Sequence, residues 1–265
     1  MGKHWYHCFL RENTREAPPR CPASLLNALL VGGVLLTLFA FAFSRLEYDF
    51  HWHGVWAYRS KFLQGLGMTL VISFFSLFVS FILGLLFALG QKSRILPLYF
   101  LSRYYVEIIR GTPLLVQILV FFYVIANAFH VHNRYVTGVM ILSLFAGAYI
   151  SEIIRAGIDS IGQTQWETGR SLGLTRFQLY RFIIFPQVFK RILPPLAGQL
   201  VSLIKDSSLL SIISVSEFTL NAQEVNAYTY STLESYIPLA LGYLVITYPI
   251  SHWSKKLEKT FAYET

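Results

Sequence analysis

The sequence predicts an all-α integral membrane protein with about six transmembrane helices, and two observations lead to that prediction. Hydrophobic residues make up 54% of the 265 residues and charged residues only 14%, a balance that soluble domains of this length do not have. Apolar runs of about 20 residues, the length of a helix that crosses a bilayer, also recur along the chain. The same composition excludes disordered chains and small disulfide-rich secreted domains.

Six apolar segments meet, or nearly meet, this length. They cover residues 24–44, 62–91, 111–129, 135–151, 192–216 and 235–254. The fifth differs from the others because Lys205 and Asp206 lie in its middle. The first could instead be a cleaved signal peptide, since the small-x-small triplet 40–42 lies near its end. Its apolar run is longer than the roughly 7 to 15 residues of such signals, so we expect a transmembrane helix.

The distribution of lysine and arginine predicts that both termini are cytoplasmic. Sixteen of the 22 basic residues fall in loops on the side of the termini, and four fall on the opposite side. Cytoplasmic loops of membrane proteins carry this excess. Orientation in the bilayer thus explains the net charge of +8, and no nucleic-acid partner is expected. Cys8 and Cys21 would lie in a reducing compartment, where we expect no disulfide.

Residues 156–191 form a cytoplasmic loop that is long enough for two short helices. The stretch Thr164–Glu167 has the Thr-x-x-Glu form of a helix-capping box, and Thr175–Gln178 repeats it as Thr-x-x-Gln. Gly173 lies between the two boxes, where a glycine can adopt the left-handed conformation that ends a helix. The pattern predicts a helix, a sharp turn, and a second helix that runs toward Pro186.

At this loop the sequence resembles the membrane subunits of ATP-binding-cassette importers, whose loop reads Glu-Ala-Ala, three residues, Gly, nine residues, Ile-x-Leu-Pro. Here Glu167–Gly169 takes the place of the triplet, Gly173 that of the glycine and Ile183–Pro186 that of the ending. Three positions differ from the family in residue type but not in spacing, namely Thr168, Gly169 and Phe185. The stretches that resemble the polar amino acid (histidine, glutamine and arginine) subfamily are Glu107–Gln117, Tyr149–Arg155, Leu203–Leu209 and Ser216–Thr219.

The resemblance begins near Gly65, so it implies two parts in the chain. Residues 1–64 hold an N-terminal cytoplasmic segment, the first transmembrane helix and an outer loop, and residues 65–265 hold the permease core. Within the core, the resemblance implies that helix 166–174 of the coupling loop 156–191 docks on a cytosolic ATPase. The residues expected to carry this coupling are Trp166, Glu167, Gly173, Leu174, Arg176 and Pro186.

The resemblance also implies partners and a location. Such a permease subunit lies in the lipid bilayer of the bacterial cytoplasmic (inner) membrane, pairs with a second permease subunit as a homodimer or heterodimer, and binds cytosolic ABC ATPase subunits. It receives a polar amino acid from an extracytoplasmic binding protein. Because no Gly-x-x-x-x-Gly-Lys-Ser/Thr loop occurs in the sequence, the chain is expected to be no enzyme and to bind no cofactor. ATP and Mg are expected on the partner ATPase.

Charged residues inside the spans are candidates for the translocation path, because an ionisable group in hydrocarbon costs about 2.5 to 3.5 kcal/mol. Glu107 and Arg110 are three residues apart on one helix face, and Glu152 and Arg155 repeat this spacing. Both pairs are predicted near the cytoplasmic surface, either paired within themselves and reaching water or facing one another as a gate. The neighbouring Thr112-Pro113 is predicted to break or kink the third span.

Lys205 and Asp206 need other partners, because adjacent residues on a helix do not face each other. With Ser207 and Ser208, the segment could bend in the middle of the membrane and offer polar groups to a solute. The alternative is that the two charges tie this span to another one.

Two other classes of protein remain open from the residues alone. An ATP-independent channel or secondary carrier would use the intramembrane charges to conduct or exchange ions. A membrane-embedded enzyme would need a catalytic constellation, and no Ser/His/Asp triad or carboxylate dyad stands out in the sequence. The histidine pairs His51-x-His53 and His130-x-His132, and the group His4, His7 and Cys8, are too weak a signal to predict a metal site.

Overall fold

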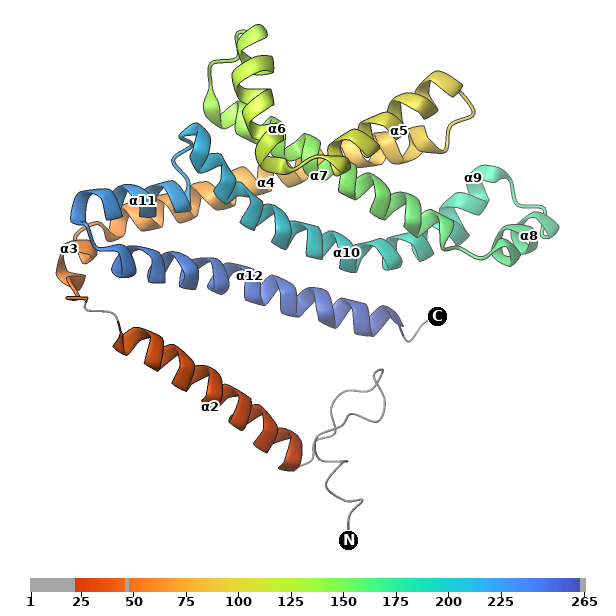
Figure 1. Ribbon diagram of the computed structural model, residues 1–265. Helices are drawn as coiled ribbons and strands as arrows, with labels where there is room; N and C mark the ends of the chain where they lie inside the picture. The colour runs from red at the N-terminus through yellow and green to blue at the C-terminus, as the bar shows by residue number, and fades with distance from the viewer. Residues whose placement is uncertain (1–21, 46–47, 263–265) are drawn as a thin grey trace. The chain divides into compact units, whose positions relative to one another are not determined.

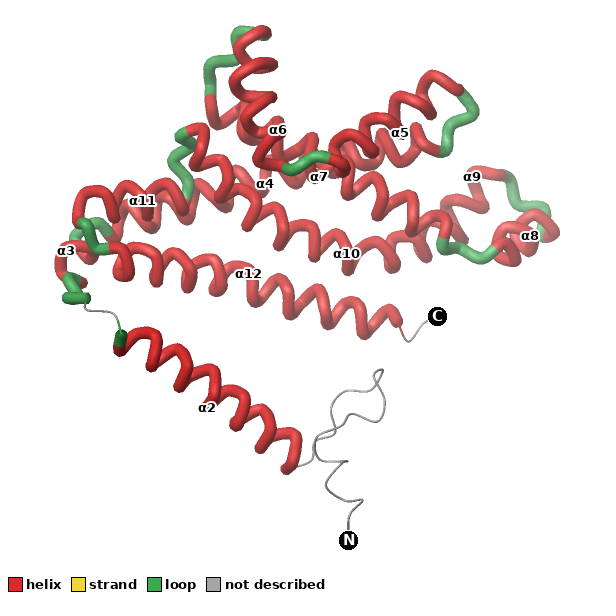
Figure 2. The backbone as a smooth tube through the Cα atoms, viewed as in Figure 1, coloured by secondary structure: helices red, strands yellow, loops and turns green. Residues whose placement is uncertain are grey.

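The protein is described by a computed structural model that covers residues 22–45 and 48–262. Over these residues every regular element is a helix, and none is a strand, as Figure 2 shows. Five helices are long and apolar enough to cross a membrane. A sixth span results if the bent pair of α5 (Leu96–Gly111) with α6 (Leu114–Val120) and η1 (Phe121–Ala126) counts as one. The predicted all-α fold with about six spans is confirmed.

The chain divides into two compact units, residues 1–50 and residues 51–265. The first unit contains α2 (Pro22–Ser44), which corresponds to the first predicted span. The apolar side chains of α2 are exposed around the helix, Leu36 to 72% for example, as is typical of a helix surrounded by lipid. All other helices, from α3 (Trp52–Trp56) to α12 (Thr232–Ala262), belong to the second unit.

The core of the second unit is the contact between α4 (Arg59–Gln91) and α7 (Arg134–Asp159). Small residues on α4 allow the two helices to approach closely, as is common between transmembrane helices. The buried ones are Ser73, Ser76, Ser80, Gly84 and Ala88. Hydrogen bonds also cross the contact, because Ser143 Oγ donates to the carbonyl of Ser76 (3.3 Å) and Ser76 Oγ to that of Val139 (3.4 Å). The exposed face of α4 carries large apolar side chains, as lipid contact requires.

The fifth span is part of one continuous helical segment that begins inside the cytoplasmic loop. It consists of α9 (Arg176–Leu179), η2 (Tyr180–Ile184), α10 (Phe185–Asp206) and η3 (Ser207–Ile213). The prediction of a separate second loop helix ending near Pro186 is therefore wrong. The π-helical turn η2 explains why: the N–H of Phe185 donates to the carbonyl of Tyr180, five residues back, so Pro186 follows the turn without breaking the helix.

The stretch 217–234, which holds three acidic residues and no basic one, forms α11 (Phe218–Thr229) and the start of α12. Glu217 caps α11, accepting from the backbone N–H groups of Leu220 (2.8 Å) and Thr219 (2.9 Å). Its carboxylate also accepts from the Tyr243 hydroxyl (3.1 Å) of α12. Burial raises the pKa of the Glu217 carboxyl, and the two backbone donors oppose that rise. This buried hydrogen bond joins α11 to α12, a contact between residues 26 positions apart that the sequence alone does not predict.

Within the second unit, α8 (Gln163–Ser171) and α9 lie at one end, and α3 and α11 lie at the opposite end (Figure 1). The charge distribution predicts that the end with α8 faces the cytoplasm. The helical hairpin of α8 and α9, the first candidate functional feature, lies at that end (Figure 1). The second, a charged pocket, is lined by residues of α5, α7 and the end of α4.

Candidate functional site: a capped hairpin and a charged pocket

The turn between α8 and α9 has the geometry of a Schellman motif. Gly173 has φ +74°, the left-handed conformation that the sequence predicts for it. The N–H of Leu174 donates to the carbonyl of Gly169 (3.1 Å), and that of Gly173 donates to the carbonyl of Arg170 (2.9 Å). The predicted capping box at Thr175 is also present, with Gln178 N–H donating to Thr175 Oγ1 (3.3 Å) and Thr175 N–H to Gln178 Oε1 (2.9 Å). The predicted sharp turn is thus confirmed.

The first predicted capping box is wrong. α8 begins at Gln163, and its N-cap is Gly162 with φ −57° and ψ 143°, so Thr164 already lies inside the helix. An N-cap residue must have extended backbone for its side chain to reach the first-turn N–H groups. The Glu167 carboxylate instead accepts from Gln163 Nε2 (2.9 Å), one helical turn earlier. The expected coupling helix 166–174 is therefore α8 followed by its turn.

One face of α8 is packed against the helix that follows the turn. Gly169 is buried, and a Cβ there would collide with Leu179 Cδ1, so the alanine of the family would force the Leu179 side chain to shift. The Trp166 ring packs edge-on against the ring of Tyr180 (5.2 Å between centroids). The opposite face is exposed to solvent at Glu167. The hairpin therefore fixes α8 to the helix that continues into the fifth span.

The other predicted coupling residues lie along the same surface. Gly173, Arg176 and Pro186 are exposed, while Leu174 is half-buried. Leu172, in the turn itself, is 72% exposed.

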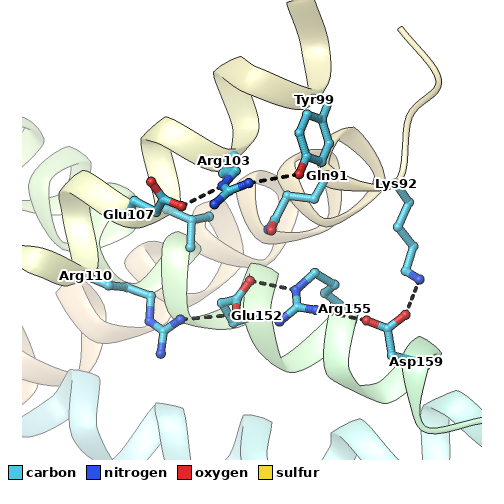
Figure 3. Close-up of a pocket in the computed structure, with 10 residues that line it drawn as sticks. Gln91, Lys92, Tyr99, Arg103, Glu107, Arg110, Glu152, Arg155 and Asp159 are labelled. Carbon is cyan, nitrogen blue, oxygen red and sulfur yellow. Dashed lines mark hydrogen bonds and ion pairs between the residues drawn. The ribbon is translucent and has the colours of Figure 1, made fainter. Parts of the chain in front are cut away.

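A pocket of about 430 Å³ lies between α5, α7 and the end of α4 (Figure 3). Along the pocket, positively and negatively charged side chains alternate and form ion pairs with their neighbours. Arg110 Nη1 lies 3.2 Å from Glu152 Oε2, Arg155 binds the same carboxylate with two bonds of 2.9 Å, and Arg155 Nη1 also reaches Asp159 Oδ2 (3.0 Å). Asp159 in turn pairs with Lys92. This chain of five charges, from Arg110 to Lys92, joins α5 to α7 and α7 to the end of α4.

The pairing of Glu107 with Arg110, one of the two arrangements that their spacing allows, does not occur in the described structure. Glu107 accepts from Arg103 Nε (2.7 Å), one turn earlier on α5, and both side chains are more than half exposed. Arg110 reaches across to α7 instead, and its guanidinium also lies over the ring of Tyr149 (5.3 Å). The two predicted pairs thus face one another through Arg110 and Glu152 alone, while the pairing of Glu152 with Arg155 is present as predicted.

Several pocket residues were not singled out from the sequence. They are Gln91, Lys92, Tyr99, Arg103, Val106 and Asp159. The spacing of Asp159 four residues after Arg155 was a usable signal, because such residues are neighbours on a helix. Lys92 and Gln91 had no comparable signal, since only the packing of α4 on α7 brings them to this place.

The break predicted at Thr112-Pro113 separates α5 from α6, and the two helices diverge there by a bend of 110°. Thr112 (φ −123°, ψ 146°) and Pro113 (φ −63°, ψ 137°) both have extended backbone. Neither residue lines the charged pocket, so both act on it through the direction of α5.

The segment Lys205–Ser208 marks a change of helix type rather than an open bend. α10 ends at Asp206, and the 3₁₀ helix η3 begins at Ser207. Ser207 is fully buried and its hydroxyl donates to the carbonyl of Ile204 (2.8 Å), so that hydroxyl is not directed at a solute. Lys205 is exposed, and Asp206 and Ser208 are half-buried. Within the described residues, no ion pair joins Lys205 or Asp206 to another helix.

Of the residues considered as metal ligands, some lie in the described part of the chain and some do not. The rings of His130 and His132 are 6.2 Å apart, and no group of three or more potential metal ligands occurs in the described part of the chain. His4, His7 and Cys8 lie outside the described residues.

This arrangement of five or six candidate spans with a capped helical hairpin at one end is that of a multi-pass membrane protein. Residues 80–262 match the family of binding-protein-dependent transport system inner membrane components. The chain belongs to this family.

Individual relatives are also membrane subunits of transporters of this family. The chain is 36% identical over 206 residues to the probable glutamine ABC transporter permease protein GlnM of Bacillus subtilis (strain 168), covering 76% of this chain and 95% of the relative. It is 40% identical to the L-cystine transport system permease protein TcyB of the same organism, over 71% of this chain and 80% of that one. A crystal structure described as an amino acid ABC transporter with histidines superimposes with a TM-score of 0.75 at 35% identity, covering 81% of this chain and all of that one.

Family membership decides among the classes that the residues left open. The chain is the membrane subunit of an ATP-binding-cassette transporter and a multi-pass protein of the bacterial inner membrane. The family implies a separate ATPase and a binding protein as partners.

Proposed function

We propose that this chain forms, with a second permease subunit, the translocation path for a polar amino acid, with both termini in the cytoplasm. The relatives named for glutamine, cystine and arginine transport support an amino acid as the solute. The partner ATPase holds ATP and Mg, and this chain binds no cofactor. The orientation rests on the excess of basic residues on the side of the termini.

The hairpin of α8 and α9 is the observation that carries the coupling role. α8 is bound to the next helix through Gly169 and Trp166, and that helix continues without interruption into the fifth span. A push on the exposed face of α8 is therefore passed to α10 by packed side chains. A flexible loop at the same place would absorb the push.

Reconstitution in liposomes tests the proposal as a whole. We expect the tagged chain to purify in mild detergent with an ATPase, and the complex to take up an amino acid only with ATP and the binding protein present. Replacing residues 166–174 by a Gly/Ser stretch of equal length removes the exposed face of α8, so the ATPase should no longer co-purify. The control replaces residues 130–132, in the turn that precedes α7. Retention of the ATPase without the α8 face would contradict docking at the hairpin.

We further propose that the charged pocket is the cytoplasmic gate of the path. Arg110, Glu152 and Arg155 close it in the described arrangement, because one carboxylate holds arginines from two helices. Separation of α5 from α7 would break the bond between Arg110 and Glu152 and leave that between Glu152 and Arg155 intact. The exposed Lys205 and the half-buried Asp206 and Ser208 are proposed to line the path deeper in the membrane.

Removing the shared carboxylate should unlock this gate. We expect Glu152→Gln to lower coupled uptake on the order of tenfold, since a half-buried ion pair of this kind is worth roughly 1 to 2 kcal/mol, between the exposed and buried limits. ATP hydrolysis without the binding protein should rise at the same time. The control is Glu107→Gln, which removes only an exposed pair with Arg103. Equal effects of the two substitutions in a liposome uptake assay would contradict the gate.

A further inference from the structure

The elbow between α5 and α6 leaves a buried carbonyl without its usual donor. In a continuous helix the N–H of residue 113 would donate to the carbonyl of Ile109, but proline has no N–H. Ile109 is only 7% exposed, so water is poorly placed to replace that donor. Buried carbonyl groups are nearly always hydrogen-bonded, which means that the protein must supply a donor from elsewhere.

Gln117 supplies this donor from the far side of the break. Its Nε2 lies 2.7 Å from the Ile109 carbonyl, 2.7 Å from Thr112 Oγ1 and 3.1 Å from the Thr112 carbonyl. Gln117 lies in the first turn of α6, and a helical side chain leans back toward the N-terminus of its helix, where the elbow lies. The Thr112 hydroxyl, which accepts from Gln117, in turn donates to the carbonyl of Ile108 (2.9 Å).

The two arms of the elbow are held by separate parts of the core. Val106 and Ile109 of α5 pack with Ala148 of α7. Leu114 and Ile118 of α6 belong to a different cluster, with Ile72, Ile141, Leu142 and Leu210. The hydrogen bonds of Gln117 cross the break between these arms. Both clusters also include residues of α7, and the hydrogen bonds of Gln117 add a direct link between the two arms at the elbow.

We propose that Gln117 is a positioning residue that holds the elbow at its bend and keeps Arg110 within reach of Glu152. Arg110 directly follows Ile109, the residue whose carbonyl Gln117 binds, so a change at the elbow moves the guanidinium first. Arg110 then lies 3.2 Å from Glu152 only while the bend is kept. The inference deepens the proposed function, because the position of Arg110 affects transport only through the proposed gate.

Distance measurements between spin labels test the elbow independently of transport. The labels are placed at Leu101 of α5 and Val124 of η1, which are both 61% exposed, after replacement of the two cysteines by serine. Measurements use the intact transporter in nanodiscs, with one labelled copy in each complex. For Gln117→Met, which keeps the side-chain length but has no donor, we expect a broader distribution shifted to longer distances, because the elbow can straighten. The matched control is Gln187→Met, since Gln187 Nε2 donates only within its own helix, to the Ile183 carbonyl (3.0 Å).

An unchanged distribution in Gln117→Met would overturn the inference. If that variant does not assemble, Thr112→Val takes its place, because it removes one acceptor of Gln117. We expect a smaller shift of the distance distribution in the same direction. The absence of a shift would again overturn the inference. Uptake separates the two proposals. A shifted distribution with unchanged uptake would support the elbow and refute the gate, whereas loss of uptake in Arg110→Gln with an unchanged distribution in Gln117→Met would support the gate and refute the elbow.

Discussion

Substituting Gly173→Val is expected to abolish most coupled uptake while leaving the protein folded in the membrane. Gly173 has φ +74°, and a Cβ in this left-handed conformation costs roughly 1 to 2 kcal/mol, more for a β-branched residue. The space around Gly173 is open, so the strain comes from the backbone alone. Relief of that strain requires the turn to change, which would rotate α8 away from Leu179 and Tyr180.

The measurement compares ATP hydrolysis with solute uptake in liposomes. We expect hydrolysis to persist and uptake to fall by at least about tenfold, which corresponds to about 1.4 kcal/mol. Gly162→Val is the matched control at the other end of α8. Gly162 has φ −57° and no neighbour closer than 3.6 Å to a Cβ, so valine fits there without strain. Uptake that is equal in both variants would contradict a role for the turn geometry.

Substituting Gly84→Val is expected to prevent stable assembly of the core. A Cβ at residue 84 would lie 2.5 Å from Ile150 Cγ2 and 3.1 Å from the backbone nitrogen of Ser151, so α4 and α7 would have to move apart. Overpacking of this kind costs about 1 to 3 kcal/mol or more where a backbone atom is in the way. The separation would also pull Ser76 from Ser143 and weaken the hydrogen bonds that cross the contact.

Membrane-extracted protein and its melting temperature are the quantities to measure. Gly67→Val is the control, because Gly67 lies on the same helix with no atom within 4 Å of a Cβ. We expect the control to keep the yield and melting temperature of the parent, and Gly84→Val to lose both. A Gly84→Val protein as stable as the control would mean that the close approach of α4 and α7 is not required.

The hairpin and the gate are connected through the same helices. α7 carries Glu152 and Arg155 and leads directly into α8, while α9 leads into α10. Arg191 of α10 binds the carbonyl of Ser160, the residue that ends α7. Movement of the hairpin would therefore act on both helices that flank it, and the charged pocket lies on one of them.

The sequence by itself determined the features that depend on near neighbours in the chain. The length of apolar runs predicted the spans, and Gly173, the Thr175 box and Thr112-Pro113 predicted where helices stop. These signals are local, because each concerns backbone angles or hydrogen bonds within about one helical turn. The Lys205-Asp206 pair suggested a bend or a tie to another span, and the described residues show only a transition from α10 to η3 there.

Only the tertiary structure decided which partner each charged side chain found. The i, i+3 spacing of Glu107 and Arg110 allowed a pair, but α5 leaves the elbow in a direction that brings Arg110 to Glu152. Glu217 is fully buried, because α4, α11 and α12 close around it. In each case the deciding contact joins segments far apart in the sequence, and local spacing holds no information about such contacts.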